Sequence, residues 1–526
     1  MRGLKKSFLL PFLLSATTIM AQQRGPRLSA LPEDPVVTAI VKEGTHYSQL
    51  ENLGQELLDG IGPRLVGTPE MQQAGDWAIA KFKEWGIPAH SEKWGEWRGW
   101  QRGPAHFEMI YPRLKSLEGM QLAWSPGTNG KPVSAETVIL PDVPDPSAFT
   151  LWLPVVKGKF VMISMLQPTG RPDKNWTEFG TPESVAKMNK ERDSLTEAWN
   201  NRIRKSGYTT KTLPAALEKA GALGIITSYW SKAVGANKIF GANTRKIPTI
   251  DLSLEDYGLL YRLTASGKKP KMRMTIESKD LPVAPAFNII AEMKGVEKPD
   301  EYVILSAHFD SWDGATGATD NGTGTLTMME AIRILKKIYP NPKRTILVGL
   351  WGSEEQGLNG SRAFVEDHPE IVSNLQALFN QDNGTGRVTS LQGMGFLHSY
   401  HYLGKWLSKV PQSIRQYIET SFPGVPGTGG SDFASFVMAG APAFSLSSLS
   451  WDYGTITWHT NRDTYDKIVF DDLRNNAILA AVMAYAASED PERTSREKIV
   501  LPVDPTTGKP REWPQPVSPT RKGGLD

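Results

Sequence analysis

The sequence predicts an α/β protein with a mixed, mostly parallel sheet flanked by helices and with an inserted β-rich domain. Three observations lead to this fold class. After Pro285, short apolar strands alternate with amphipathic helices, which is typical of a parallel sheet. Polar residues collect where those strands end. Around residues 125–282 the pattern changes to shorter strands, which indicates a separate unit inserted into the first.

The composition narrows the classes of protein and of site. The chain has 526 residues, of which 40% are hydrophobic and 22% charged, as in a globular protein of more than one domain. Its net charge is +3, and three of the cations (Arg2, Lys5 and Lys6) lie in the first 21 residues without an acid. The rest of the chain is therefore neutral and lacks the basic patch by which nucleic-acid binding is recognised. Cysteine is absent, so a metal site must be built from histidine and carboxylates.

The two ends of the chain are predicted to lie outside the folded domains. Residues 1–21 have the pattern of a secretory signal peptide, with basic residues, an apolar run over 8–14 and a cleavage site after Ala21. The apolar run is shorter than the ~20 residues of a membrane span. We therefore expect a secreted or periplasmic protein that has no membrane partner after cleavage. Residues 491–526 are rich in proline and predict an extended strap or a frayed tail.

Residues 22–124 are predicted to be the N-terminal part of the main domain. Between Tyr47 and Gly86, leucines and then aromatic residues recur on one helical face, which predicts two helices separated by a break at 60–63. Three tryptophans follow at 94, 97 and 100. They indicate packing or interface residues in preference to a binding platform.

Residues 125–282 are predicted to form the inserted domain. Strands are expected over 137–140, 160–165 and 247–250, and helices over 182–207 and 254–263. The runs AGALGII and IPTIDLSLEDYGLL make this block resemble a protease-associated (PA) domain. The block contains no run of catalytic residue types, so the resemblance implies a non-catalytic module.

Residues 283–490 are predicted to be the catalytic part of the main domain. Strands are expected over 288–293, 302–307, 345–351, 375–380 and 443–446, and helices over 324–338 and 472–487. In sheets of this type ligands bind beyond the carboxyl ends of the strands.

Candidate metal ligands follow those strands. Each residue alone has a structural interpretation, such as a helix N-cap for an aspartate that opens a helix. Together they are two histidines, three acidic ligands and one spare glutamate, a set that could hold two divalent ions, with zinc the natural choice. Such ions would activate a water molecule, and the spare glutamate would move its proton. The residues concerned are His308, Asp310, Asp320, Glu354, Glu355, Asp382 and His459.

The runs HFDS, TDNGTG, SEEQGLNGS, QDNGTG and WHTNRDTYD resemble the di-zinc exopeptidase family of aminopeptidase S and glutamate carboxypeptidase, with a layout closest to carboxypeptidase Q. The resemblance covers roughly 45–110 and 285–490. It implies that His308 and Asp382 hold one zinc ion, that Glu355 and His459 hold the other, and that Asp320 bridges them. It further implies that Glu354 is the general base and that Asp310 supports His308.

Several features of the family pattern are open. Relatives polarise the scissile carbonyl with a tyrosine or another donor, but Trp458 precedes His459 here, and Tyr453, Tyr465 and Arg462 are the candidates. The stretch 424–432 is either a substrate loop or a plain flexible loop. The glycosylation patterns at Asn321 and Asn383 adjoin proposed ligands, so we interpret them as chance matches.

The predicted function is that of a zinc-dependent exopeptidase acting on short peptides, with two zinc ions per chain. Aminopeptidase action and carboxypeptidase Q-like dipeptidase action are both open. The alternative is a non-catalytic receptor or binding protein on a peptidase scaffold, which the presence of all five ligands and the base disfavours, as it also disfavours a one-zinc glutaminyl cyclase. The oligomeric state is open, and a homodimer is one option.

Overall fold

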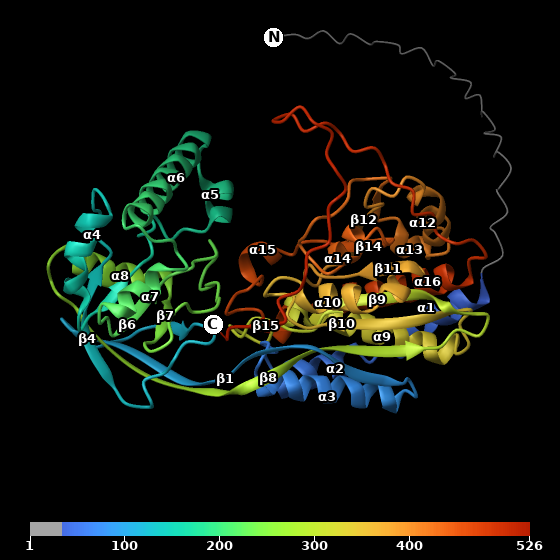
Figure 1. Ribbon diagram of the computed structural model, residues 1–526, viewed down its shortest axis with the longest axis horizontal. Coiled ribbons are helices and arrows are strands. Elements are labelled where there is room, and N and C mark those ends of the chain that lie inside the picture. The colour runs from blue at the N-terminus through green and yellow to red at the C-terminus, as the bar shows by residue number, and fades with distance from the viewer. Residues whose placement is uncertain (1–33, 526) are drawn as a thin grey trace, which may run out of the picture.

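The computed structural model describes residues 34–525, which form a larger and a smaller lobe joined by a long β-ribbon (Figure 1). The predicted signal peptide, residues 1–21, lies outside the described residues. Among the helices of residues 34–525, none combines the length and apolar character that a membrane crossing requires.

The larger lobe contains the mixed, mostly parallel sheet that the sequence predicts. The neighbouring strands β10, β9, β11 and β14 are parallel, whereas β8 and β12 pair antiparallel with β10 and β14 at the two sides. The strand order reverses at β9, because β10 lies on one side of it and β11 on the other. Ligands of open α/β sheets bind at such a reversal. The bounds are β8 Lys271–Met293, β9 Lys298–His308, β10 Arg344–Trp351, β11 Leu375–Asn380, β12 Val388–Gln392, β13 Glu419–Ser421 and β14 Ala443–Ser448.

Helices cover both faces of this sheet. One layer packs α9 and α16 against each other and against β9, with α1 and α2 outside them. On the same side α3 contacts β8 and η1, whereas on the other face α10 contacts β8 and α14 contacts β11. The helices of this lobe are α1 Pro35–His46, α2 Leu50–Gly54, η1 Gln55–Ile61, α3 Pro69–Glu84, η3 Ala318–Gly322, α9 Thr323–Ile338, α10 Asn359–Asp367, α11 Pro369–Ser373, α12 Ser399–Leu407, α13 Gln412–Arg415, α14 Phe433–Met438, α15 Tyr453–Ile456, η4 Tyr465–Lys467 and α16 Phe470–Glu489.

The ribbon consists of β1 (Ala89–Tyr111) and β8, two antiparallel strands of 23 residues each that run from one lobe into the other (Figure 1). The register shifts four times along the ribbon. Trp94, Trp97 and Trp100 lie on β1 with no more than 6% of their surface exposed. The prediction that these tryptophans pack in the interior is confirmed.

The smaller lobe has its own sheet and its own apolar core. Strands β4, β5, β6 and β7 pair in that order, β3 pairs with β7, and the lobe core includes Phe107, Met109 and Leu117. These three core residues and β3 precede residue 125, where we expected the insert to begin. The remaining elements are β2 Lys115–Ser116, β3 Gly119–Gln121, β4 Val133–Ile139, α4 Pro146–Trp152, η2 Leu153–Val156, β5 Phe160–Met162, α5 Asp173–Phe179, α6 Pro182–Lys205, α7 Leu213–Lys219, β6 Gly224–Thr227, β7 Thr249–Leu252 and α8 Leu254–Ala265.

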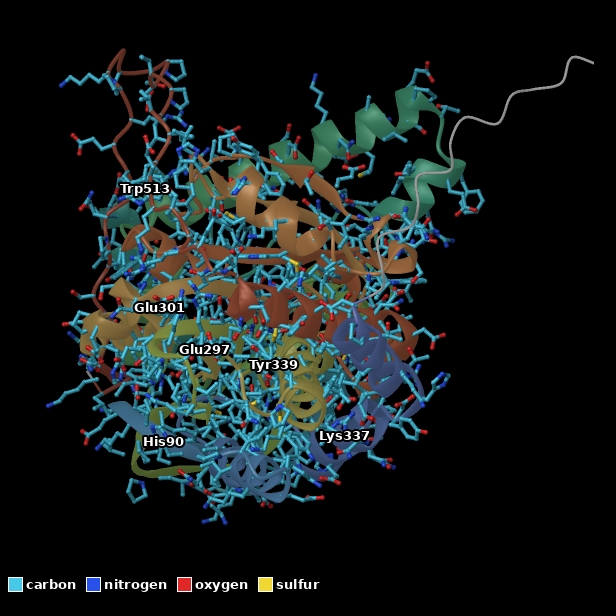
Figure 2. The ribbon with its side chains drawn as sticks, turned by 90° about the vertical axis from the view of Figure 1, so that its right-hand side faces the viewer. His90, Glu297, Glu301, Lys337, Tyr339 and Trp513 are labelled. Atoms are coloured by element: carbon cyan, nitrogen blue, oxygen red, sulfur yellow. The ribbon has the colours of Figure 1, made fainter. Side chains whose placement is uncertain are left out.

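The C-terminal segment is a strap across the larger lobe. Trp513, labelled in Figure 2, donates from its indole to the Val437 carbonyl at 2.9 Å and packs at an angle against the ring of Phe396, with 5.5 Å between the centroids. Further along, β15 (Lys522–Gly523) pairs with β1. The extended strap, one of the two forms that the proline content predicts, is therefore the form observed.

Candidate metal centre

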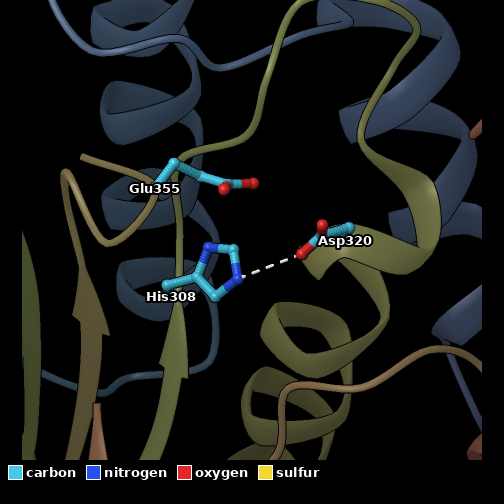
Figure 3. A group of neighbouring side chains, drawn as sticks. All are labelled: His308, Asp320 and Glu355. Carbon is cyan, nitrogen blue, oxygen red and sulfur yellow. Dashed lines mark ion pairs between the residues drawn. The ribbon is translucent and has the colours of Figure 1, made fainter. Parts of the chain in front are cut away.

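The predicted ligands come from loops that leave neighbouring strands at one edge of the sheet. His308 is the last residue of β9, Glu354 and Glu355 follow β10, and Asp382 follows β11. Asp320 lies in η3, just before α9, and His459 follows α15. Figure 3 shows His308, Asp320 and Glu355 converging, and the sheet thus brings all six side chains into one buried cluster.

Asp320 occupies the centre of this cluster. Its Oδ1 lies 3.3 Å from Nε2 of His308, and its Oδ2 lies 3.3 Å from Nε2 of His459. Nε2 of His308 also lies 3.1 Å from Oδ1 of Asp382, and Nε2 of His459 lies 2.9 Å from Oε2 of Glu355. One oxygen of Asp320 is therefore available to each histidine–carboxylate pair, as a bridging ligand requires.

The donor set fits zinc. Two donors bound to one tetrahedral zinc ion at about 2.0–2.1 Å lie roughly 3.3 Å apart, close to the distances of 2.9–3.3 Å between the paired atoms. Oδ2 of Asp320 and Oε1 of Glu355 are also buried without a hydrogen-bond partner. A bound cation would satisfy these oxygens, which are costly to bury unpaired.

Asp320 is free for this role because a neighbour caps the helix. We expected an aspartate here to serve as an N-cap if the site were structural. Instead Oδ1 of Asn321 accepts from the Gly324 amide at 3.0 Å, while its Nδ2 donates to the Gln381 carbonyl at 2.9 Å. Asn321 is fully buried by these contacts, which agrees with the interpretation of its glycosylation pattern as a chance match.

The electrostatics of the site are those of crowded, buried carboxylates. Burial and the carboxylates of neighbouring residues raise the pKa values of Glu354 and Glu355 well above the ordinary range. Burial alone would lower the pKa of His308, but Asp382 and Glu354 raise it well above its ordinary value. Close carboxylates of this kind repel each other unless a positive charge lies between them.

Asp310 supports the site in a different way from the one expected. Nδ1 of His308 lies 2.9 Å from the backbone carbonyl of Asp310 and 3.8 Å from its carboxylate. The carboxylate instead accepts from the amides of Glu354, at 3.0 Å, and Glu355, at 3.3 Å. These two bonds fix the turn that presents both glutamates.

Two supporting residues were not predicted for these roles. The oxygens of Asp463 accept from the amide of Thr319 at 2.8 Å and from that of Asp320 at 2.9 Å. Arg64 is fully buried and donates to four backbone carbonyls, most of them in the loop between β9 and η3. Both residues act on backbone groups, so the only signal in the sequence is a charged residue at a position that proves to be buried.

The three candidates for the donor that polarises the scissile carbonyl, Tyr453, Tyr465 and Arg462, differ in their distance from the metal-ligand cluster. Tyr453 lies close enough to Asp320 to lower the pKa of that carboxyl, and burial together with the charge of Asp320 raises the pKa of Tyr453 well above the ordinary value. The hydroxyl of Tyr465 points to the Glu51 carbonyl, and Arg462 pairs with Glu118 at 2.7 Å. Of these three candidates, Tyr453 alone lies against the metal-ligand cluster.

The smaller lobe reaches the metal centre through a hairpin over residues 229–241. The amide of Ile239 donates to the His459 carbonyl at 2.8 Å, and the ring of Phe240 meets the imidazole edge-on at 5.3 Å. Asn237 and Asn461 exchange hydrogen bonds at 3.0 Å. A lobe without predicted catalytic residues thus borders a proposed metal ligand.

Comparison with known proteins identifies the larger lobe. Residues 288–484, which contain the whole ligand cluster, match the sequence profile of peptidase family M28. These residues are an M28 peptidase domain. Carboxypeptidase Q of Rattus norvegicus is 25% identical over 460 residues, which are 86% of this chain and 88% of that protein. A probable glutamate carboxypeptidase of Arabidopsis thaliana is 35% identical over 31% of this chain and 26% of its own.

Solved structures agree with the fold of the M28 domain and its insert. A peptidase M28 precursor from Shewanella amazonensis superposes with a TM-score of 0.64 at 24% identity, covering 89% of this chain and 98% of its own. A zinc aminopeptidase from Bacillus subtilis superposes with a TM-score of 0.53 at 18% identity, covering 86% and 97%. The solved structures confirm the predicted fold class. The M28 profile and the carboxypeptidase Q relative confirm the predicted type of activity: the chain is a metallo-exopeptidase.

Proposed function

We propose that this M28 peptidase holds two zinc ions per chain and removes terminal residues from short peptides. His308 and Asp382 would bind one ion, Glu355 and His459 the other, and Asp320 both. The observation that supports this proposal most directly is the placement of the two Asp320 oxygens, each 3.3 Å from a different histidine. Zinc at such a site supplies a Lewis acid for the scissile carbonyl and lowers the pKa of a water molecule.

The residues of the chain would divide the remaining work. Glu354 lies with His308 and Asp382 at one side of the cluster and is not needed as a ligand in the pairing above. Its carboxylate would take a proton from the attacking water and pass it to the departing amine. Asp310 would hold Glu354 and Glu355 in place through their amides. Tyr453, beside Asp320, is the proposed donor to the scissile carbonyl.

Replacing the two neighbouring glutamates separately tests these assignments. Glu354→Gln keeps the size of the side chain but cannot accept a proton, so zinc content should stay near two per chain while the rate falls about 10²–10⁴-fold. Glu355→Gln replaces a charged ligand by a weak neutral one, so the protein should lose zinc and recover some activity when zinc is added. Glu366→Gln, on the exposed side of α10, is the matched control.

Metal analysis and peptide hydrolysis are measured on all four proteins. If Glu354→Gln loses zinc and Glu355→Gln keeps it, the two roles are exchanged. Wild-type hydrolysis in both variants would show that this cluster is not the active site, and full activity of zinc-free protein would remove the proposal altogether.

The terminus of the substrate can be determined with blocked dipeptides. The relative that is similar over most of the chain is a carboxypeptidase by name, whereas the Bacillus subtilis protein that shares the fold is an aminopeptidase by name. Loss of hydrolysis only when the amine is blocked would establish an aminopeptidase. Loss when either end is blocked would establish a dipeptidase.

A further inference from the structure

A lysine without a carboxylate partner lies beside the metal centre. Lys238 belongs to the hairpin over 229–241, and its ammonium lies 3.6 Å from the centre of the Trp458 ring. The same ring stacks on the His459 imidazole with 4.2 Å between the centroids. One aromatic side chain therefore separates this ammonium from a proposed zinc ligand.

The charge of Lys238 is not neutralised within residues 34–525. The ammonium donates to the Gly454 carbonyl at 3.2 Å and contacts the Trp458 ring, but no carboxylate of the described residues forms an ion pair with it. Burial lowers the pKa of Lys238 to about 8, partly offset by the charge of Asp320. By contrast, Lys159, Lys205 and Lys232 of the smaller lobe each form an ion pair with an acid.

The other cations near the metal centre are already engaged or point elsewhere. Arg64 is occupied by backbone carbonyls and Arg462 by Glu118. Arg362 lines a cavity of about 480 Å³ between α10 and the C-terminal strap, and its nearest acids are Asp432 and Glu354, whose charges partly offset the lowering of its pKa by burial. Lys238 differs from Arg64 and Arg462 in that a single backbone carbonyl and an aromatic ring are its side-chain contacts, which leaves donors of its ammonium for a substrate.

The hairpin holds Lys238 in a fixed place. Asp251 is almost fully buried and accepts from the amide of Tyr229 at 2.8 Å and from the side chain of Asn237. The backbone of Lys238 is paired on one side with Tyr229 and on the other with Thr460. A cation on a backbone fixed in this way loses less freedom when it binds an anion, which increases the affinity.

We propose that Lys238 binds the free carboxylate of the substrate, so that the smaller lobe selects peptides that end one residue beyond the scissile bond. This inference rests on the proposed peptidase function and specifies its substrate class. One residue of an extended peptide spans about 3.5 Å. A carboxylate one residue beyond the scissile bond therefore lies near the metal ligands, and Lys238 is separated from the ligand His459 by a single aromatic ring. Lys238 is therefore a specificity-determining residue and has no part in the chemical step.

The proposal is tested by a double cycle, in which the carboxylate of the substrate and the ammonium of Lys238 are removed separately and together. The substrates are a dipeptide and the same dipeptide with its carboxylate amidated, and the enzymes are wild type and Lys238→Met, which keeps the stem on Trp458 but removes the charge. A hydrogen bond to a charged group predicts that amidation lowers kcat/KM of the wild type about 10–100-fold. In Lys238→Met, amidation should change kcat/KM less than threefold, with zinc content unchanged.

The controls separate this proposal from the function on which it depends. Lys232→Met removes a lysine from the same hairpin that lies 3.4 Å from Asp173, and it should behave as wild type. If the wild type prefers the free dipeptide and Lys238→Met keeps that preference, Lys238 has no such role and the peptidase proposal stands. Equal hydrolysis of both substrates by the wild type would remove carboxylate recognition alone. Inactivity toward every peptide would remove both proposals.

Discussion

Replacing Asp463 by asparagine should loosen zinc binding although no proposed ligand is removed. The two oxygens of Asp463 accept one amide each, from Thr319 at 2.8 Å and from Asp320 at 2.9 Å. These bonds fix the backbone at the residue that offers one oxygen to each histidine. Asparagine has the same size but a single acceptor oxygen, and its NH₂ group would face one of the two amides.

The size of the effect follows from the lost bond. A hydrogen bond to a charged group contributes about 1.5–3 kcal/mol, and 1.4 kcal/mol corresponds to about tenfold in an equilibrium constant. If the whole cost falls on the conformation that binds metal, zinc affinity decreases about 10–100-fold. This range agrees with the effect usually found for groups that support metal ligands.

Zinc affinity is measured by competition with a chromophoric chelator at pH 8. Burial raises the pKa of Asp463 to about 7, so the carboxylate is largely ionised at that pH and both of its acceptors are present. Asp466→Asn changes the same side chain three residues along, where 73% of it is exposed, and should leave the affinity unchanged. An Asp463→Asn protein that binds zinc within threefold of the wild-type affinity would refute the reasoning.

Three further predictions concern stability. Burial raises the pKa of Asp251 to about 7, so the folded state keeps a proton that the unfolded state has lost, and the contribution of Asp251 to stability decreases as pH rises from about 4 to about 7. Urea unfolding should show the advantage of wild type over Asp251→Asn shrinking over that interval, and a constant difference would contradict the assignment. A fragment of residues 104–282 should unfold cooperatively, whereas 125–282 should not, because it lacks Phe107, Met109 and Leu117 of the lobe core; calorimetry of both fragments decides. A chain that ends at Pro510 loses the contacts of Trp513 and the pairing of β15, and its Tm should decrease by about 5 °C with activity kept; an unchanged Tm would show that the strap contributes no stability.

The central strands β9, β10, β11 and β14 and the long helices α3, α9 and α16 could be predicted because their apolar patterns are local, whereas β12, β13 and the short helices between residues 359 and 456 were not predicted. The long ribbon of β1 and β8, which joins the two lobes, could not be predicted. Sequence patterns predicted a strand only over 288–293, whereas β8 begins at Lys271. Gly95, Gly99 and Pro104 interrupt the alternation in β1, and the structure places register shifts at these points. Glycine and proline indicate strand breaks in a sequence, but in this ribbon they mark bulges within continuous strands.

The metal ligands could be predicted for a similar reason. A parallel sheet brings the carboxyl ends of its strands together, so residues that are distant in the sequence, such as His308 and Asp382, meet at one edge. The residues that support them follow no such rule. Asp463 acts on amides more than 140 residues away, and Arg64 acts on carbonyls about 250 residues away. Their contacts are with the backbone, which leaves no pattern of side chains to recognise.

The contact between the smaller lobe and His459 connects metal binding with substrate selection. His459 has a φ of 60°, in the left-handed region that costs a residue other than glycine about 1–3 kcal/mol. Hydrogen bonds of about 1 kcal/mol each from Ile239 and between Asn237 and Asn461 offset this cost. The segment that provides them also carries Lys238. A displacement of the hairpin would therefore move a proposed zinc ligand and the proposed carboxylate site together, so the lobe that contains no metal ligand contributes to both.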